Sequence, residues 1–255
     1  MKTFFLYLTL LVAGLPVLFA QDFYLPVSSP SETAKKAYQA ASYLGSNIRF
    51  DAARAEIEKA LEADPNFFMV YAYTYQALAN DADKPAVLNK ALAIDPVGFT
   101  EAEKIMRGLL LAQQANPKAS PAKAMKALTK AYPQTAEAFE WAYLHAFYTD
   151  KNEKAGLAYA QKFVAIDPNF PPVHNTLGYY YMGKKEMEKA KAAFEKYLEL
   201  APAEPNAHDS MGEYYLTVGD YAKSIEHYEQ AVALGMAASQ AGADKARAAM
   251  TDAQN

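Results

Sequence analysis

The spacing of apolar and polar residues along the chain is that of α-helices. Ser31, Glu32 and Thr33 resemble a helix start, and apolar residues follow them at helical spacing through Leu44. Alanine is frequent against a background of leucine, lysine and glutamate, whereas valine and isoleucine are sparse. This composition favours helix over strand. The pattern therefore predicts an all-helical chain.

A second regularity repeats every 34 residues in the C-terminal half of the chain. The stretch TLGYYYMGKKEMEKAKAAFEKYLELAP, from Thr176 to Pro202, returns as MGEYYLTVGDYAKSIEHYEQAVALG. The offset aligns five pairs of positions: Leu177 with Met211, Gly178 with Gly212, Tyr181 with Tyr215, Phe194 with Tyr228, and Leu198 with Val232. A fixed period of this length indicates stacked structural repeats.

These recurring positions resemble the tetratricopeptide repeat family. The family's pattern of a Leu-Gly pair, a tyrosine, an alanine, an aromatic residue and a closing proline occurs here as Leu177, Gly178, Tyr181, Ala190, Phe194 and Pro202. Asp-Pro steps at 64–65, 95–96 and 167–168 mark further helix exits, because proline lacks an amide donor and disfavours helix in the residue before it. The resemblance implies an all-α, right-handed alpha-solenoid of stacked helix-turn-helix units with a C-terminal capping helix.

The resemblance divides residues 31–236 into six expected helix pairs. Their ranges are 31–64, 66–96, 99–132, 135–168, 171–204 and 205–236, and a capping helix and tail follow at 237–255. Gly178 and Gly212 would let the two helices of a pair approach closely, while Phe194 and Tyr228 fill the gap. Residues 21–30, QDFYLPVSSP, show no sustained period and are interpreted as a linker.

The first twenty residues have the pattern of a secretory signal peptide. Lys2 precedes the apolar run FFLYLTLLVAGLPVLF, and the small residue Ala20 precedes Gln21. The run is shorter than the roughly 20 residues that a bilayer span needs. We expect cleavage after Ala20 and secretion across an inner membrane into a periplasm, with no transmembrane span afterwards. A membrane anchor formed by an uncleaved N-terminal segment is the alternative.

Composition excludes several classes of function. The chain has no cysteine, which excludes disulfides, thiolate catalysis and cysteine-based zinc sites. The formal net charge is -4 with both signs mixed along the chain, so no nucleic-acid partner is expected. No phosphate loop, metal-ligand spacing or catalytic motif occurs, so we predict no cofactor, no metal and no catalytic residue. His208, Asp209 and Ser210 do not form a triad, because adjacent helical residues point about 100° apart.

The resemblance also implies that the first helix of each pair lines a concave face. Residues one helical turn apart on these helices define a predicted partner-binding groove, which comprises Tyr38, Met69, Tyr73, Trp141, His145, Tyr148, Asn175, Tyr179, Met182, Asp209 and Glu213. This groove is aromatic in its middle and acidic at its C-terminal end. Tyrosine and tryptophan are enriched in binding hot spots because they combine a large contact area with a polar tip. Core packing of several of these aromatic residues is the alternative.

The function implied by the resemblance is that of a non-enzymatic adaptor or scaffold, which binds a protein or peptide segment in its concave groove. Other functions stay open from the sequence. A small ligand, such as a glycan or a peptide fragment, would stack on Trp141, Tyr148 and Tyr179, and a closed pocket would favour this alternative. A hydrolase would use Asp209 and Glu213 as paired carboxylates. Self-association is a further alternative.

Overall fold

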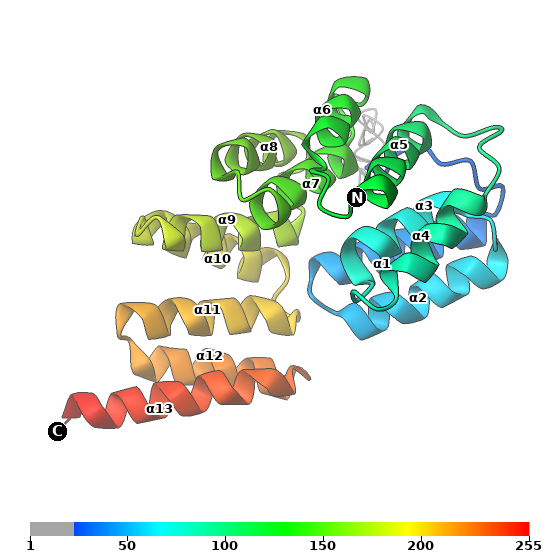
Figure 1. Ribbon diagram of the computed structural model, residues 1–255. Helices are drawn as coiled ribbons and strands as arrows, with labels where there is room; N and C mark the ends of the chain where they lie inside the picture. Colours follow the sequence, from blue (N-terminus) through cyan, green and yellow to red (C-terminus); the bar gives the residue numbers. More distant parts are fainter. Residues whose placement is uncertain (1–22, 255) are drawn as a thin grey trace, which may run out of the picture.

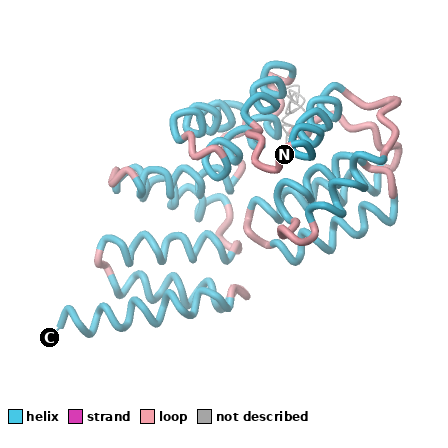
Figure 2. Tube along the Cα trace, viewed as in Figure 1, coloured by secondary structure: helices cyan, strands magenta, loops and turns pink. Residues whose placement is uncertain are grey.

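The chain forms a stack of helix pairs (Figure 1). The computed structural model describes residues 23–254, and over this range it contains helices, turns and loops but no strand (Figure 2). The predicted all-α class and alpha-solenoid architecture are confirmed. The predicted signal peptide, residues 1–20, lies outside the described residues. Every helix between residues 23 and 254 is too short or too polar to cross a bilayer.

Six helix pairs and a final helix follow one another within residues 23–254. The pairs are α1 (Glu32–Ser46) with α2 (Phe50–Ala63), α3 (Phe68–Tyr73) with α4 (Lys84–Ala93), α5 (Glu101–Ala115) with α6 (Ala122–Ala131), α7 (Ala136–Leu144) with α8 (Glu153–Ile166), α9 (Pro171–Gly183) with α10 (Met187–Leu200), and α11 (Pro205–Val218) with α12 (Tyr221–Ala233). Two π-helical turns, η1 (Thr74–Leu78) and η2 (His145–Thr149), extend α3 and α7. A 3-10 turn, η3 (Ala237–Ser239), leads into α13 (Gln240–Gln254), which packs on α12 and α11.

Prolines and side-chain caps set the ends of these helices. Both α2 and α8 end directly before an Asp-Pro step, as the sequence predicts. Pro171 and Pro205 stand at the first position of α9 and α11. An amide at this position would have no acceptor within the helix, so the amide that proline lacks is not missed. At the start of α5, the Thr100 hydroxyl accepts a hydrogen bond from the Glu103 amide, and the Glu103 carboxylate accepts one from the Thr100 amide.

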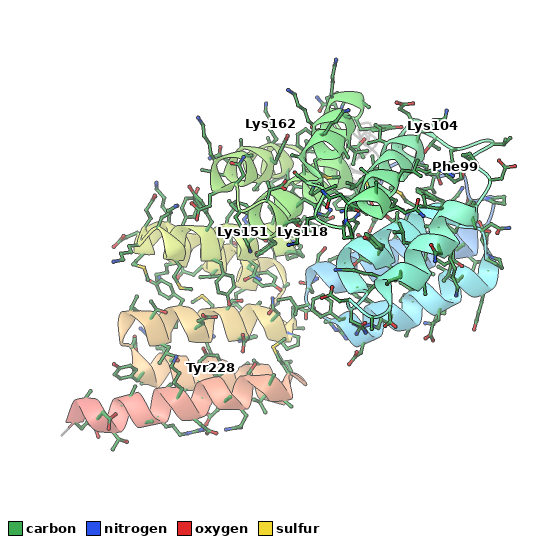
Figure 3. All side chains as sticks on the ribbon, viewed as in Figure 1. Phe99, Lys104, Lys118, Lys151, Lys162 and Tyr228 are labelled. Carbon is green, nitrogen blue, oxygen red and sulfur yellow. The ribbon has the colours of Figure 1, made fainter. Side chains whose placement is uncertain are left out.

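Glycines allow the helices of the two C-terminal pairs to approach closely. A Cβ atom added at Gly178 in α9 would lie 2.4 Å from the ring of Phe194 in α10. A Cβ atom added at Gly212 in α11 would lie 2.8 Å from the ring of Tyr228 in α12, a residue marked in Figure 3. Neither position has room for a side chain, because the aromatic ring fills the space. The close approach predicted from the sequence is confirmed at both glycines.

The stack follows a curved path that brings its first pair against its fifth (Figure 1). In the turn between α1 and α2, Oδ1 of Asn47 accepts a 2.8 Å hydrogen bond from the hydroxyl of Tyr197 in α10. Arg49 lies 3.8 Å from Glu204, which precedes α11. Asn47 and Tyr197 are both fully buried. The inner surface of the solenoid is therefore closed at this point, where a simple open groove was expected.

Residues 23–30 form an extended segment that packs into the fold ahead of α1. Leu25 is 3% exposed, and Phe23 packs against Phe163 and Phe170 with ring centroids 6.0 and 5.0 Å apart. The prolines and serines of this stretch suggest a linker, but the structure makes it part of the core. The physical reason is that the alternating residues Phe23, Leu25 and Val27 give an extended chain one apolar side.

Candidate functional site

The inner surface of the solenoid encloses a cavity of about 420 Å³. Its walls come from α1, the turn after it, the first residue of α2, the end of α3, η1, α7, η2 and α9. The lining combines apolar and aromatic residues with polar ones, and it includes Ser42, Ser46, Ile48, Phe50, Tyr73, Gln76, Glu140, Trp141, Leu144, His145, Tyr148, Thr149, Asn175 and Thr176. Both the volume and this mixture of residues are typical of small-molecule sites, which span roughly 300–1,000 Å³.

Two π-helical turns shape the cavity wall. In η1 the amide of Ala79 donates to the carbonyl of Thr74 at 2.8 Å, and in η2 the amide of Asp150 donates to the carbonyl of His145 at 2.9 Å. Each bond spans five residues, so the turn is wider than an α-helical turn. Gln76, His145 and Tyr148 line the cavity from these turns. The first helices of two pairs are therefore widened where they meet the cavity.

Three large side chains of the lining are open to solvent, and we call them the cavity mouth. Tyr148 is 55% exposed, Ile48 47% and Phe50 41%. Ile48 has a φ of 63°, in the left-handed region that is costly for a β-branched residue. The neighbouring contact between Asn47 and Tyr197 holds this turn in place. The shape of the mouth thus depends on the contact between the first and fifth pairs.

Glu140 is the acidic residue of the cavity lining. It is 2% exposed, and its Oε1 accepts a 2.6 Å hydrogen bond from the hydroxyl of Ser46. Burial raises the pKa of Glu140 to about 8; the hydrogen bond from Ser46 opposes this rise, and the charge of Glu137 adds to it. The lining contains no lysine or arginine that would pair with this carboxyl.

Aromatic rings stand beside Glu140 in the same wall. Trp141 packs edge to face on Tyr73, with ring centroids 6.2 Å apart, and its ring lies 6.0 Å from that of His145. Burial lowers the pKa of His145 to about 4, so this imidazole is neutral at neutral pH. Its Nδ1 lies 3.3 Å from the hydroxyl of Thr149. The cavity therefore presents aromatic surface and a buried carboxyl, without a positive charge.

A second polar site, next to the cavity, holds the N-terminal segment. The amide of Leu25 donates a 2.6 Å hydrogen bond to Oε2 of Glu137, and the amide of Glu137 donates a 2.9 Å bond to the carbonyl of Phe23. The amide of Ser28 donates to the carboxylate of Glu103 at 3.1 Å. The segment is thus bound through its backbone, by side chains in the first turns of α5 and α7.

Glu137 connects the two polar sites. It is fully buried, it stands three residues before Glu140 on α7, and its Oε1 accepts a 2.6 Å hydrogen bond from the hydroxyl of Tyr38. Burial raises the pKa of Glu137 to about 7, against hydrogen bonds from Tyr38, Leu25 and Trp141 that lower it. Both glutamates consequently change charge close to neutral pH.

The acidic end of the predicted groove forms its own hydrogen-bonded cluster. The hydroxyl of Tyr179 donates to Oε2 of Glu213 at 2.8 Å, and the hydroxyl of Ser239 donates to Oδ1 of Asp209 at 2.5 Å. Burial raises the pKa of Asp209. Within residues 23–254, no group of three histidine, aspartate or glutamate side chains is arranged to hold a metal ion.

The structure brings together some of the predicted groove residues and separates others. Those that line the cavity are Tyr73, Trp141, His145, Tyr148 and Asn175, and of these Tyr148 alone is exposed. Tyr38 and Met69, at 1% and 0% exposure, belong to the core and do not face a groove, because Tyr38 is tied to Glu137 and both are covered by neighbouring helices. Tyr179, Met182, Asp209 and Glu213 are half-buried and lie outside the cavity lining. Binding by any of these residues stays a prediction.

Most of the lining residues are absent from the predicted groove, among them Ser46, Ile48 and Glu140. A sequence signal exists for Glu140, because the stretch AEAFEWAYL of α7 is apolar apart from Glu137 and Glu140. Charged residues are rarely placed in the buried part of a helix without a specific partner. Ile48 has no such signal, since a turn between two helices shows no periodicity.

Comparisons with known proteins find one family model and several solved structures. The family model described as tetratricopeptide repeat matches residues 171–204 and 205–234. No curated protein sequence matches the chain. Among solved structures, yeast Tom70 is 14% identical with a TM-score of 0.53, over 89% of this chain and 52% of that one. PilW, described as a widely conserved type IV pilus biogenesis factor, is 22% identical with a TM-score of 0.46, over 78% of this chain and 92% of that one. A thermophilic tetratricopeptide repeat protein from Thermus thermophilus is 17% identical with a TM-score of 0.43, over 86% of this chain and 99% of that one.

Two helix pairs of the chain, residues 171–204 and 205–234, match the tetratricopeptide repeat model, and the helix pairs on the N-terminal side continue the same solenoid architecture. Proteins of this family are in general non-catalytic scaffolds that bind other proteins on a curved inner surface.

Proposed function

We propose that this protein is a non-catalytic adaptor that binds a segment of another protein on its concave face, at the cavity mouth. The observation that carries the proposal is the binding of residues 23–30 as an extended peptide by Glu103 and by Glu137, which stands three residues before the cavity residue Glu140 on α7. Glu103 and Glu137 accept backbone amides of this segment, and such hydrogen bonds, which do not depend on side-chain identity, support the proposal that the protein recognises an extended chain.

The cavity mouth is the part of this face that is free to meet a partner. Tyr148, Ile48 and Phe50 are large apolar residues, each more than 40% exposed, around a concave opening. Exposed apolar residues that are grouped around a pocket are typical of interaction sites, and tyrosine is enriched in binding hot spots. The rigid helices hold these side chains in place, so a partner meets a surface that is already organised.

The experiment is site-specific photo-crosslinking. A photoreactive phenylalanine analogue is placed at Tyr148, and in a matched control at Val97, which is 84% exposed in the loop before α5. We expect a defined crosslinked protein from position 148 in intact cells of the source organism, and none from position 97. Tyr148→Ala in a chain labelled at Phe50 should weaken the crosslink. Equal products from positions 148 and 97, or none from position 148, would rule out a partner at the mouth.

We also propose that the protein acts after export, in a periplasm. Support comes from the apolar run behind Lys2 and the small residue Ala20. The test is N-terminal sequencing of protein recovered from the cell envelope, where Gln21 is the expected first residue. An N-terminus at Met1 in a membrane fraction would favour the anchored alternative.

A small ligand is the second candidate function, and the cavity of about 420 Å³, which is open at its mouth, favours it. A cavity with a buried polar group and aromatic walls is the usual form of a small-molecule site. Native mass spectrometry of protein purified from its own cells tests this candidate. A bound mass that is lost in Tyr73→Ala would support it, whereas a ligand-free protein that still crosslinks through position 148 would favour the adaptor.

A further inference from the structure

We infer that the cavity is a site for an organic cation, in which an ammonium or guanidinium group meets the carboxyl of Glu140 beside the rings of Tyr73 and Trp141. The inference rests on the proposed binding role of the concave face and states the chemistry of what binds there. Lysine and arginine side chains of a partner segment carry these groups, and so do free amines.

The first argument is that Glu140 is buried without a counter-charge. Its side chain is 2% exposed, the cavity lining contains no lysine or arginine, and Ser46 supplies a neutral hydrogen bond to one oxygen. A buried carboxyl costs far more free energy than a glutamine or methionine of similar size unless a cation or several hydrogen bonds compensate it. Without such a partner the carboxyl avoids this cost by keeping its proton, and a ligand with a positive group would take the place of that proton.

The second argument is the aromatic character of the wall around this carboxyl. Tyr73 and Trp141 lie edge to face with ring centroids 6.2 Å apart, and both line the cavity together with Tyr148. The faces of tryptophan and tyrosine rings attract cations through their quadrupole, and this attraction strengthens when the cation is removed from water. The carboxylate of Glu140 and the aromatic rings around it therefore both favour a positively charged ligand.

Other titratable groups around Glu140 leave the site neutral or negative. Tyr24 of the N-terminal segment, Tyr38 of α1, Tyr73 of α3 and Tyr143 of α7 all have a pKa raised by burial, so they are uncharged at neutral pH. His145 in η2 is neutral above its lowered pKa of about 4. Glu137 is the remaining group, and it adds negative charge as pH rises through about 7.

Cation binding is consequently linked to proton release. Burial holds the pKa of Glu140 near 8, so the carboxyl is mostly protonated at pH 7 and must lose its proton to pair with a cation. The affinity for a guanidinium group, which stays charged over this range, should rise on the order of tenfold per pH unit from about pH 6 to 7. It should level off above the pKa of about 8.

Trp141 provides the signal for the test, because it is the only tryptophan of the chain and lines the cavity. The purified full-length protein is titrated with N-acetylarginine amide, and in parallel with N-acetylcitrulline amide, in which a neutral urea replaces the guanidinium. We expect a saturable change in tryptophan fluorescence with the arginine compound and at least tenfold weaker binding of the citrulline compound. Calorimetry in two buffers of different ionisation enthalpy should show proton release at pH 7.

Two further probes distinguish the source of the cation. Agmatine represents a free amine, and the peptide Gly-Gly-Arg-Gly-Gly represents an arginine within a protein segment. Tighter binding of the peptide supports a partner side chain, and tighter binding of agmatine supports a free amine; both outcomes support a cation site. Equal affinity of the arginine and citrulline compounds at pH 8 would overturn it. Affinity that falls as pH rises would also overturn it, because Glu140 would then act as a neutral hydrogen-bond donor.

The decisive variant is Glu140→Gln, which keeps the size of the side chain and an acceptor for Ser46 but removes the charge. It should abolish the preference for arginine over citrulline and the proton release. Glu226→Gln is the matched control, an exposed glutamate on α12 outside both the cavity lining and the predicted groove, and it should bind like the wild type. If the crosslink at position 148 forms while all cationic probes fail, the adaptor function stands and the cation site is refuted. If neither is seen, both fail.

Discussion

The hydroxyl of Tyr197 donates a 2.8 Å hydrogen bond to Oδ1 of Asn47, a residue 150 positions earlier in the chain. Asn206 donates a 3.1 Å hydrogen bond from Nδ2 to the same tyrosine oxygen, and all three residues are buried. The contact joins the first helix pair to the fifth and lies next to Ile48 of the cavity mouth. The hydroxyl of Tyr197 thus holds the first and fifth helix pairs together at the edge of the cavity.

Tyr197→Phe should loosen this closure. The substitution removes the hydroxyl that donates to Oδ1 of Asn47, so this buried oxygen loses its hydrogen bond. We therefore expect the free energy of unfolding to fall by about 1–2 kcal/mol. Urea denaturation measures the loss, and small-angle scattering should show a larger radius of gyration. Tyr180→Phe, on a half-exposed ring of α9, is the matched control and should change neither quantity. An unchanged radius in Tyr197→Phe would mean that other contacts close the solenoid.

Stability should fall as pH rises from about 6.5 to about 8. Burial raises the pKa of Glu137 to about 7 and that of Glu140 to about 8, whereas both groups titrate near 4.5 in the unfolded chain. The folded state therefore binds more protons than the unfolded state in this window, and a rise in pH favours unfolding. We expect a slope of roughly 1 kcal/mol per pH unit for each carboxyl below its folded-state pKa, so the contribution of Glu137 should level off near pH 7 and that of Glu140 near pH 8, as measured by urea denaturation. The burial of His145 has the opposite effect, but only below its unfolded pKa of about 6.5.

Glu140→Gln isolates the contribution of one of these carboxyls. The variant should be more stable than the wild type at pH 8 and should show a shallower dependence on pH, because it has no charge to bury. Near pH 5, where Glu140 is already neutral, the difference should shrink. A pH dependence identical to that of the wild type would contradict the burial of this carboxyl.

The repeats were predictable where their markers are local in sequence. Gly178 and Phe194 are 16 residues apart, a distance set by the helix pair itself, and the Asp-Pro steps end helices through the covalent structure of proline. The contact of Asn47 with Tyr197 was not predictable, because no local pattern relates residues so far apart. A prediction that lacks this contact gives a groove on the concave face, whereas the structure has a cavity there.

The π-helical turns explain why the sequence predicted the wrong set of exposed groove residues on α7. Trp141, His145 and Tyr148 share one face of an ideal α-helix, but the π turn begins at His145. Trp141 and His145 are therefore buried in the wall at 6% and 8% exposure, while Tyr148 reaches solvent at the mouth. For the N-terminal segment, the alternation of Phe23, Leu25 and Val27 indicates an extended chain with one buried side. The linker was predicted instead because Pro26 and the serines are typical of linkers.

Leu25→Ala should show that the N-terminal segment stabilises the fold. Leu25 is 3% exposed, so loss of its side chain leaves a cavity in the core, and we expect a cost of about 2–3 kcal/mol. Pro26→Ala, on the exposed neighbour, should stay within about 0.5 kcal/mol of the wild type. Hydrogen exchange should also find the amides of Leu25 and Ser28 protected, since both donate to buried glutamates. Equal stability of the two variants and rapid exchange would instead describe a linker.

Two alanine substitutions in α9 should have opposite signs. In Gly178→Ala the new Cβ would lie 2.4 Å from the ring of Phe194, which must shift within a packed interface, and we expect a loss of about 1–3 kcal/mol. In Gly183→Ala the new Cβ meets no atom within 4 Å, so the higher helix propensity of alanine should stabilise the protein, by up to about 0.5 kcal/mol because Gly183 is the last residue of the helix. Both variants place alanine for glycine in α9 and differ in the space around the new Cβ. Their free energies of unfolding, measured by urea denaturation, therefore separate the effect of packing from that of helix propensity. If both variants were stabilised, Gly178 would be replaceable, and the close approach of α9 and α10 would not require glycine.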